Sequence, residues 1–502
     1  MTSGCVLMNG LKRNICSPWQ ADRRGITEKD KAMIKKSIIL IALLSVVLLV
    51  PACTREKGEP MNPEGAQSAT KPIQLMTLDP GHFHAALVQK SMYEQISPVV
   101  YVYAPAGADL QEHLKRIDGY NKRKDNPTRW EEKVYTGPDY LQKMLSEKPG
   151  NVMVTAGNNK LKTEYLKSAV DAGIHVLADK PMCIDKTGFE LLKQAFDSAK
   201  QHQVLLFDIM TERHEITSML QKELAQIPAV FGQFQPGTPE DPAVTKESVH
   251  HFYKTVSGSP LIRPGWFYDV QQQGEGIVDV TTHLVDLVMW ACFPDQIIDY
   301  TKDMELLKAR RWATQISREQ FERSTGLKEF PDYLKSVQDA AGAIAVYSNG
   351  EIVYTLRGIH AKVSVVWNYE APPGGGDTHY SIMKGTQALL MIKQGKEQNY
   401  RPELYVQAAP GADPATVGRE LPKAIQDLQT KYPGIAAQQQ GDLWQIVIPD
   451  NYRNGHEAHF AQVTEKFLSY VTAGKMPDWE TPNMLAKYFL TTQALEMARQ
   501  AK

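Results

Sequence analysis

The chain has 502 residues, of which 42% are hydrophobic and 23% charged, and this ordinary balance excludes a disordered chain, a disulfide scaffold and a collagen-like fibre. The 56 Lys and Arg residues nearly match the 57 Asp and Glu residues, so no basic field exists that would gather nucleic acid. Only one apolar run approaches the length of a membrane span, which excludes a multi-span membrane protein. The length predicts two or three domains.

The first 71 residues predict export and anchoring. Lys35 and Lys36 precede an apolar run at 37–50 that is too short to span a bilayer comfortably and is typical of a signal peptide. This segment, 33–52, resembles a bacterial lipoprotein signal and is followed directly by Cys53. We expect a lipid on Cys53 and an exported lipoprotein on the periplasmic or outer-membrane face, held to the membrane by that anchor only. An uncleaved signal anchor is the alternative.

Two flanking segments carry no expected fold. Residues 1–32 have no hydrophobic period, and we expect them to be disordered or to reflect a start assigned too far upstream. Residues 53–71 are rich in Thr, Glu, Gly, Pro, Ser and Lys, which is the composition of a flexible tether. The folded body is therefore expected to begin near residue 72.

Residues 72–212 alternate short apolar segments with amphipathic ones. This pattern predicts a doubly wound parallel sheet of the Rossmann type, which binds ligands at the carboxyl ends of its strands. The expected strands are 73–79, 99–105, 151–157, 174–181 and 204–210, and the expected helices follow Gly81 and cover 160–173 and 189–203.

The turn after the first strand carries a weak dinucleotide signal. It runs from Asp79 to His84, and only the middle glycine of a G-x-G-x-x-G pattern, Gly81, is present. That glycine would let the backbone approach a pyrophosphate, although a plain Pro-Gly turn explains it equally well. The second strand ends without the acidic residue expected to bind a ribose, and Asp109 is the nearest candidate.

Residues 213–502 predict a second domain built on a large antiparallel sheet. Alternating segments are joined by turns such as Ser348-Asn349-Gly350, and two amphipathic helices close the chain. The expected strands are 230–235, 342–348, 351–358, 361–370, 388–394 and 441–448, and the expected helices are 457–471 and 484–500.

Two motifs resemble one enzyme family. Ala178-Asp179-Lys180-Pro181 is similar to the Glu-Lys-Pro signature of the glucose-fructose oxidoreductase/inositol dehydrogenase/MocA (Gfo/Idh/MocA) family, with Asp179 in place of Glu. About a hundred residues later, the segment from Gly274 to Asp286, with Trp290 after it, resembles the family's G-G-G-x-x-x-D-x-G-x-H-x-x-D segment. The resemblance covers roughly residues 72–400.

The resemblance implies a catalytic set and a bound nicotinamide dinucleotide, NAD or NADP. Lys180 corresponds to the lysine that contacts nicotinamide and substrate hydroxyl, Asp279 to an acidic residue that holds substrate, and His283 to the general base. The residues implied to bind the cofactor are Gly81, His82, Phe83, His84, Asn158, Asn159, Asp179, Lys180 and Pro181.

The second motif also has an interpretation from spacing alone. In a helix, residues 279, 283, 286 and 290 form one stripe on an otherwise apolar surface, so their polar groups must be paired internally or face a cleft. In the structural alternative, Asp286 simply satisfies His283 in the core. Lys180, expected at the end of a nearby strand, favours the cleft.

Other polar segments suggest substrate contacts. Trp266 and Tyr268 could stack on a sugar ring, and Lys254 and Arg263, with Asp279, could bind hydroxyls or a carboxylate; an ordered surface loop is the alternative. The segment 374–379 could be a flap or a plain hairpin loop. The pairs His82/His84, His250/His251 and Asp279/His283 could form a zinc site, but the Lys180 ammonium would repel a cation, and we expect no metal.

The sequence therefore predicts an NAD(P)-dependent oxidoreductase that acts on a secondary alcohol of a sugar, cyclitol or glycoside. Because free dinucleotide is scarce outside the cytoplasm, the cofactor is expected to be tightly held. Two alternatives stay open: an NAD-dependent glycoside hydrolase or lyase that works by transient oxidation and elimination, and a non-catalytic carbohydrate-binding surface lipoprotein. The resemblance also implies a homo-oligomer.

Overall fold

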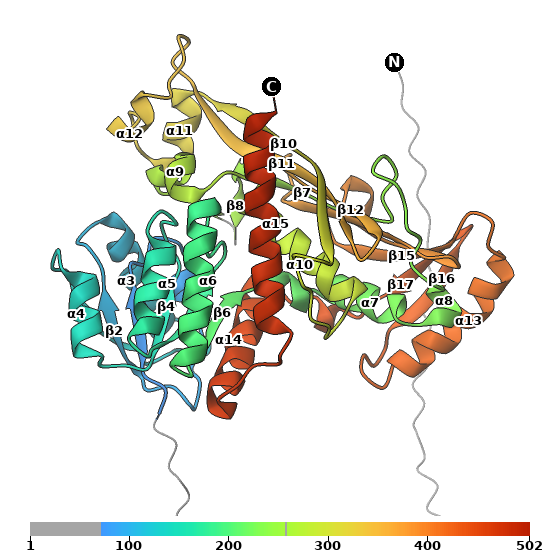
Figure 1. Cartoon of the computed structure of the whole chain (residues 1–502), viewed down its shortest axis with the longest axis horizontal. Coiled ribbons are helices and arrows are strands. Elements are labelled where there is room, and N and C mark those ends of the chain that lie inside the picture. The colour runs from blue at the N-terminus through green and yellow to red at the C-terminus, as the bar shows by residue number, and fades with distance from the viewer. Residues whose placement is uncertain (1–71, 257–258, 502) are drawn as a thin grey trace, which may run out of the picture. The chain divides into compact units, whose positions relative to one another are not determined.

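A six-stranded parallel sheet occupies the first part of the chain, as the alternating pattern predicts (Figure 1). The computed structural model describes residues 72–256 and 259–501, so the predicted signal peptide, the tether and Cys53 lie outside the described residues. The strands are β1 (Leu75–Leu78), β2 (Val99–Tyr103), β3 (Glu131–Tyr135), β4 (Val152–Thr155), β5 (His175–Asp179) and β6 (Leu206–Ile209), in the order β3-β2-β1-β4-β5-β6. The connections change direction between β1 and β4, which places a ligand site at that edge.

Helices connect these strands and cover the sheet. The turn after β1 enters only a short helix, and β3 was not expected from sequence because its residues are mostly charged and exposed at the sheet edge. The helices are α2 (His84–Leu87), α3 (Ala108–Lys122), α4 (Tyr140–Glu147), α5 (Lys162–Asp171) and α6 (Lys186–Gln201), followed after β6 by a 3-10 helix, Thr211–His214.

A nine-stranded, largely antiparallel sheet forms the second part (Figure 1). Its order is β10-β11-β12-β7-β13-β14-β15-β17-β16, and β12 pairs with β7 in parallel. The strands are β7 (Val244–Tyr253), β10 (Met304–Ile316), β11 (Ile344–Leu356), β12 (Ile359–Glu370), β13 (Thr378–Lys384), β14 (Ala388–Lys393), β15 (Glu403–Ala408), β16 (Ala436–Gln440) and β17 (Leu443–Val447), with a small pair, β8 (Thr255–Val256) and β9 (Ser259–Pro260), beside them.

Helices in this part cover the sheet or carry side chains toward the first domain. The two terminal helices that the sequence predicts are confirmed. They are α14 (His456–Ala473) and α15 (Glu480–Gln500); the others are α7 (Ile216–Ala225), α8 (Pro228–Phe231), α9 (Val270–Gln273), α10 (Thr281–Cys292), α11 (Arg318–Thr325), α12 (Asp332–Lys335) and α13 (Pro414–Leu428), with 3-10 helices at Gly265–Tyr268, Lys396–Gln398 and Asp450–Tyr452.

Two expectations about the second sheet were wrong. Ser348-Asn349-Gly350 is not a turn, because β11 continues through it and Asn349 lies opposite Trp312 of β10 in the strand register. The Asn349 amide donates to the Trp312 carbonyl at 3.0 Å, and a Cβ at Gly350 would lie 2.6 Å from Ile277. The turn instead follows β11 at Arg357 and Gly358, both with positive φ. The expected strand 230–235 begins inside α8, where Pro228 starts the helix.

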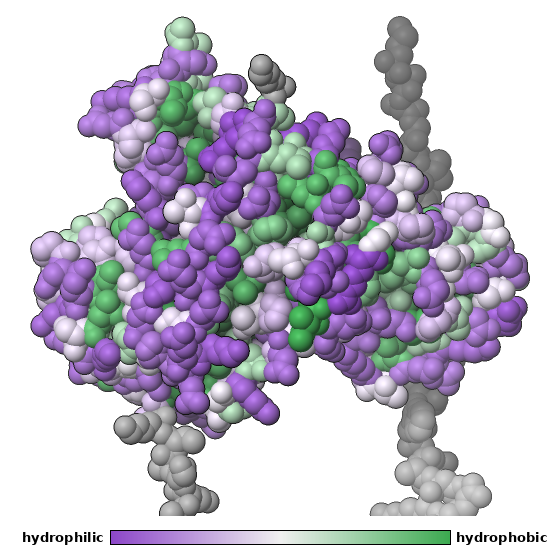
Figure 2. All heavy atoms as spheres, viewed as in Figure 1, coloured by the Kyte–Doolittle hydropathy of each residue, from purple (hydrophilic) through white to green (hydrophobic). Residues whose placement is uncertain are grey.

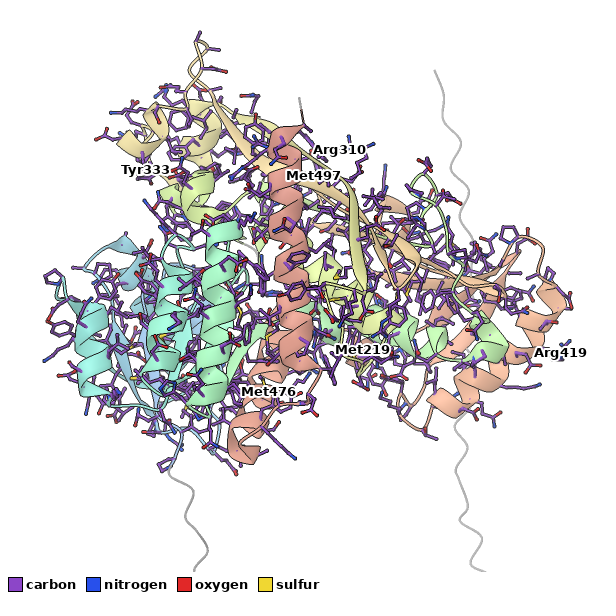
Figure 3. The ribbon with its side chains drawn as sticks, viewed as in Figure 1. Met219, Arg310, Tyr333, Arg419, Met476 and Met497 are labelled. Carbon is purple, nitrogen blue, oxygen red and sulfur yellow. The ribbon has the colours of Figure 1, made fainter. Side chains whose placement is uncertain are left out.

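The terminal helices join two hydrophobic cores. Phe460, Phe467 and Tyr488 pack in the core of the parallel sheet, whereas Leu490 and Leu495 pack in the core under the large sheet. Met476 packs against the first core and Met497 against the second, and both are labelled in Figure 3. The chain therefore returns at its C-terminal end to complete the domain it began with.

The surface in view is mainly hydrophilic, with apolar side chains in separate patches (Figure 2). Of the helices described, none combines the length and apolar composition needed to cross a membrane.

Candidate active site

A cavity of about 500 Å³ lies at the carboxyl edge of the parallel sheet. Its walls come from the turn after β1, the ends of β4 and β5, the 3-10 helix after β6, strands β7, β12 and β13, helix α10 and the first turn of α14. Seven of the thirteen histidines of the chain line it: His82, His84, His250, His283, His379, His456 and His459. The predicted catalytic residues Lys180, Asp279 and His283 all line this cavity.

Lys180 and Asp279 form an ion pair in the cavity wall. The Lys180 ammonium donates to Asp279 Oδ1 at 2.6 Å, and both side chains are largely buried. Gln273 donates its amide to Asp279 Oδ2 at 3.1 Å, so the carboxylate is fixed from both sides. Asp279 lies in the turn before α10 rather than in the helix, which begins at Thr281. An ammonium held this way presents a fixed positive charge to an oxygen in the cavity.

His283 is not the partner of Asp286, which excludes the core network that the spacing left open. Asp286 instead accepts two hydrogen bonds from Arg213 at 2.6 Å and one from Lys487 at 2.8 Å. The His283 Nδ1 atom is buried without a hydrogen-bond partner. Burial, and then the charge of Lys180, lower the pKa of His283 well below 6.5, so its imidazole is neutral at pH 7 and able to accept a proton.

Asp179, which replaces the family's glutamate, lies against two histidines. Its Oδ2 atom is 3.0 Å from His84 Nδ1 and 3.6 Å from His82 Nδ1. The buried Lys162 ammonium donates to the backbone carbonyl of Asp179 at 3.0 Å and thereby fixes the end of β5. The predicted residues His82, His84, Asp179 and Lys180 are thus brought together, along with Phe83, which also lines the cavity.

The side-chain amides of Asn158 and Asn159 donate hydrogen bonds to α9 in the second domain. Asn158 donates to the Gln272 side chain at 2.7 Å and Asn159 to the Gln273 carbonyl at 2.7 Å. Asn159 lines the cavity, whereas Asn158 does not, and Pro181 is buried behind Lys180. These contacts position α9 and, through Gln273, the Asp279 carboxylate.

Two aromatic residues expected to stack on a sugar are in the protein interior. Tyr268 is 2% exposed, packs between Phe252 and Phe321, and bonds the Ser324 hydroxyl. Trp266 is also buried and donates its indole N–H to Asp109 Oδ2 at 2.8 Å. The stacking expectation is therefore wrong, because the 3-10 helix at 265–268 turns these rings into an aromatic core.

Arg263 and Lys254 line the cavity, as expected, but their charged groups already have partners within the protein. Arg263 donates to the carbonyls of Phe252 and His251 at 2.7 and 2.8 Å. Lys254 pairs with Asp377, which His250 and His251 also contact. Although burial opposes it, these neighbours hold the pKa of Asp377 far below its ordinary range. The segment 374–379 therefore includes a fixed cavity residue and is not a plain exposed loop.

Several cavity residues escaped the sequence argument. His456 and His459 lie on the first turns of α14, and His456 packs against His84 with ring centroids 5.0 Å apart. Their i, i+3 spacing at the start of a predicted helix was the available signal. Glu212 also lines the cavity, and burial, together with neighbouring Glu215, raises its pKa to about 7.

A second hollow of about 230 Å³ lies at the ends of β1 and β2. Its lining includes Asp79 and Asp109. Gly81, predicted to bind the cofactor, is in the lining of neither cavity: Pro80 before it lines the second, and His82 after it lines the first. A Cβ at Gly81 would lie 3.0 Å from Asp109 Oδ2 and 3.2 Å from the Trp266 ring, so the hydrogen-bonded pair Trp266–Asp109 rests on the glycine. Asp79 stands where the first glycine of the dinucleotide pattern would be and has φ of 47°.

Comparison with known proteins places the chain in a family. Residues 220–499 match the family described as "Putative oxidoreductase C terminal domain". A "putative oxidoreductase" from Parabacteroides merdae is 59% identical, with a TM-score of 0.85, over 88% of this chain and 100% of that chain. The chain belongs to the Gfo/Idh/MocA oxidoreductase family. No curated protein matches it.

Solved structures of much lower identity share the two-domain fold. Biliverdin reductase from Synechocystis, solved with biliverdin and NADP+, is 12% identical, with a TM-score of 0.51, over 85% of this chain and 99% of that chain. GenD2 from gentamicin A biosynthesis, solved with NAD, is 14% identical, with a TM-score of 0.51, over 88% of this chain and 98% of that chain. At such identities the likeness concerns the fold alone.

Proposed function

We propose that this Gfo/Idh/MocA oxidoreductase oxidises or reduces a secondary alcohol of a sugar, cyclitol or glycoside with a retained nicotinamide dinucleotide. The observation that carries the proposal is the placement of the Lys180–Asp279 pair and the neutral His283 in one cavity at the carboxyl edge of the parallel sheet. The NAD and NADP+ bound to fold relatives support the choice of cofactor.

The residues around Gly81 fit a dinucleotide. The two hollows, of about 500 and 230 Å³, are lined by residues 82–84 after Gly81 and 79–80 before it, and Gly81 and Gly157 let the β1 and β4 ends approach closely. The hydrogen-bonded side chains of Trp266 and Asp109 lie against the glycine, beside the Gly157 backbone, and form one wall of this region. Gly81, His82, Phe83, Asn159 and Lys180 would hold the cofactor, which supplies hydride transfer when bound.

The protein's own groups supply the proton chemistry. As hydride leaves the carbinol carbon, the hydroxyl proton must pass to a base, and the neutral His283 accepts it. Lys180 stabilises the developing alkoxide, and Asp279 orients Lys180 and accepts a bond from a neighbouring substrate hydroxyl. In the reverse direction His283 returns the proton to the carbonyl oxygen.

The test combines native mass spectrometry with turnover. We expect the chain, purified without added nucleotide, to carry one NAD(H) or NADP(H), and sugars to change the nicotinamide absorbance. His283→Ala should retain nucleotide and lose about 10²–10⁴-fold in turnover, whereas His202→Ala, at an exposed position, should match the wild type. A chain that binds neither nucleotide overturns the proposal, and release of an aglycone without net redox change indicates elimination instead.

We also propose that the mature protein is a lipoprotein that begins at Cys53. The run at 37–50 and the small residue Ala52 before the cysteine support this. Mass spectrometry of the N-terminal peptide from membranes should find a lipid-modified Cys53, and Cys53→Ser should release the protein from the membrane. An unmodified Cys53 in membrane-bound protein would contradict the proposal.

A further inference from the structure

His82, His84 and Asp179 form a compact set of metal-ligand groups. The histidines lie at i, i+2 in the turn between β1 and α2, and Asp179 is the last residue of β5. Their ligand atoms all lie within 4.8 Å of one another, and two of the separations are 3.0 and 3.6 Å. Because zinc bonds of about 2.0–2.2 Å place tetrahedral ligand atoms about 3.3–3.6 Å apart, small side-chain adjustments suffice to bring this set around one ion.

One of these ligand atoms has no partner in the protein. His82 Nδ1 is buried and makes no hydrogen bond, although it faces the carboxylate oxygen that His84 already contacts. A buried polar atom without a partner costs free energy, and a metal ion between the two imidazoles and the carboxylate would satisfy it.

The charge of Lys180, which argued against a metal from sequence, is compensated. Its ammonium is 2.6 Å from Asp279 Oδ1. The other close lysine, Lys162, donates to the backbone carbonyl of Asp179, and the carboxylate keeps its contacts with the two histidines of the set. The set thus keeps a carboxylate for a cation, and its members line the cavity, where further coordination positions are open to water or a substrate oxygen.

From this geometry we propose that His82, His84 and Asp179 bind a first-row divalent transition metal of the zinc class. Two imidazoles and one carboxylate with open positions are a ligand set typical of such ions at catalytic sites. The site goes beyond the proposed oxidoreductase function. It places a Lewis acid beside Lys180, so that a substrate hydroxyl or carbonyl in the cavity can coordinate the ion.

The proposal is tested by direct metal binding to the full chain as purified, after chelation and dialysis and without added nucleotide or substrate. Titration calorimetry with Zn²⁺ should give one site, and Co²⁺ should give the visible absorption of a low-coordinate centre. Asp179→Asn and His82→Gln should each weaken binding by at least about 100-fold. His379→Ala, which removes a cavity histidine outside the set, should bind like the wild type.

Near-ultraviolet circular dichroism establishes whether each variant is folded. If His82→Gln does not fold, the nearly isosteric Asp179→Asn carries the test. A folded wild type that binds no Zn²⁺ overturns the proposal. The proposal is also overturned if Asp179→Asn and His82→Gln bind Zn²⁺ as tightly as the wild type, or if His379→Ala loses as much affinity as they do. Since the readout is metal binding, and neither nucleotide content nor turnover, failure here leaves the proposed oxidoreductase function intact.

Discussion

Glu212 has a pKa of about 7, against 4.5 for an ordinary glutamate, because burial and Glu215 disfavour its ionised form. The folded chain therefore holds this proton where the unfolded chain has lost it, and stability falls as pH rises from about 4.5 to 7. Glu212→Gln should relieve this cost, raising the free energy of unfolding on the order of 1–3 kcal/mol at pH 8 and little at pH 4.5. Urea unfolding of the wild type and the variant at both pH values measures the change in the free energy of unfolding. An equal gain at pH 8 and pH 4.5 would contradict the raised pKa of Glu212 as its cause.

Substitutions at Asp286 and at His283, three residues apart, should differ sharply in their effect on the free energy of unfolding. Asp286→Asn weakens the pairing of Arg213 and Lys487, which are both buried, and should cost about 3–5 kcal/mol of unfolding free energy. His283→Ala breaks no hydrogen bond and should cost no more than about 1 kcal/mol. Chemical denaturation measures the free energy of unfolding of both variants. A similar loss in the two would show that His283 has a structural role.

These residues also mark what the sequence could predict of the site. Lys180, Asp279 and His283 were found because family motifs preserve them, and they meet as expected. The partner of Asp286 was beyond prediction because Arg213 and Lys487 reach it from 73 and 201 residues away. Tyr268 shows the limit of composition, since an aromatic residue in a polar segment can line a cavity or enter a core.

At the scale of elements, the segment 265–273 covers the edge of the parallel sheet. It bonds Asp109 through Trp266 and Asn158 through Gln272, and Tyr333 of α12, labelled in Figure 3, lies near its Gly265. Strands β3, β7, β10, β13, β15 and β16 were not expected from the sequence. The other strands of the two sheets were predictable from apolar runs and alternation. The register of β11 was not, because only the contacts of Asn349 and Gly350 with neighbouring elements keep a turn-forming sequence extended.

Trp266→Phe tests whether this cover retains a nucleotide. The substitution keeps the ring and removes the N–H that bonds Asp109, a contact to a charged group worth about 1.5–3 kcal/mol. If the cover holds the proposed cofactor, bound nucleotide should exchange at least about tenfold faster in a displacement assay. Trp312→Phe, on β10, is the matched control. An unchanged exchange rate would show that the pair is only a domain contact.

At the scale of the whole molecule, α15 is part of both domains. Lys487 bonds Asp208 of β6 and Asp286 of α10, both at 2.8 Å, and Tyr488 bonds Asp208 from within the first core. We expect a chain shortened after residue 478 to lose the tertiary structure of both domains, and one shortened after residue 500 to keep it. Near-ultraviolet circular dichroism compares the two; a folded first domain in the shorter chain would contradict this role.

The position of α15 has a consequence for synthesis of the protein. Domains near the start of a chain commonly fold while the ribosome is still adding later residues. Here the core of the first sheet lacks Met484 and Tyr488, and Asp208 lacks its cation, until residues 480–500 have been translated. Nearly the whole polypeptide must therefore emerge before its first domain can close, and folding becomes a single late event.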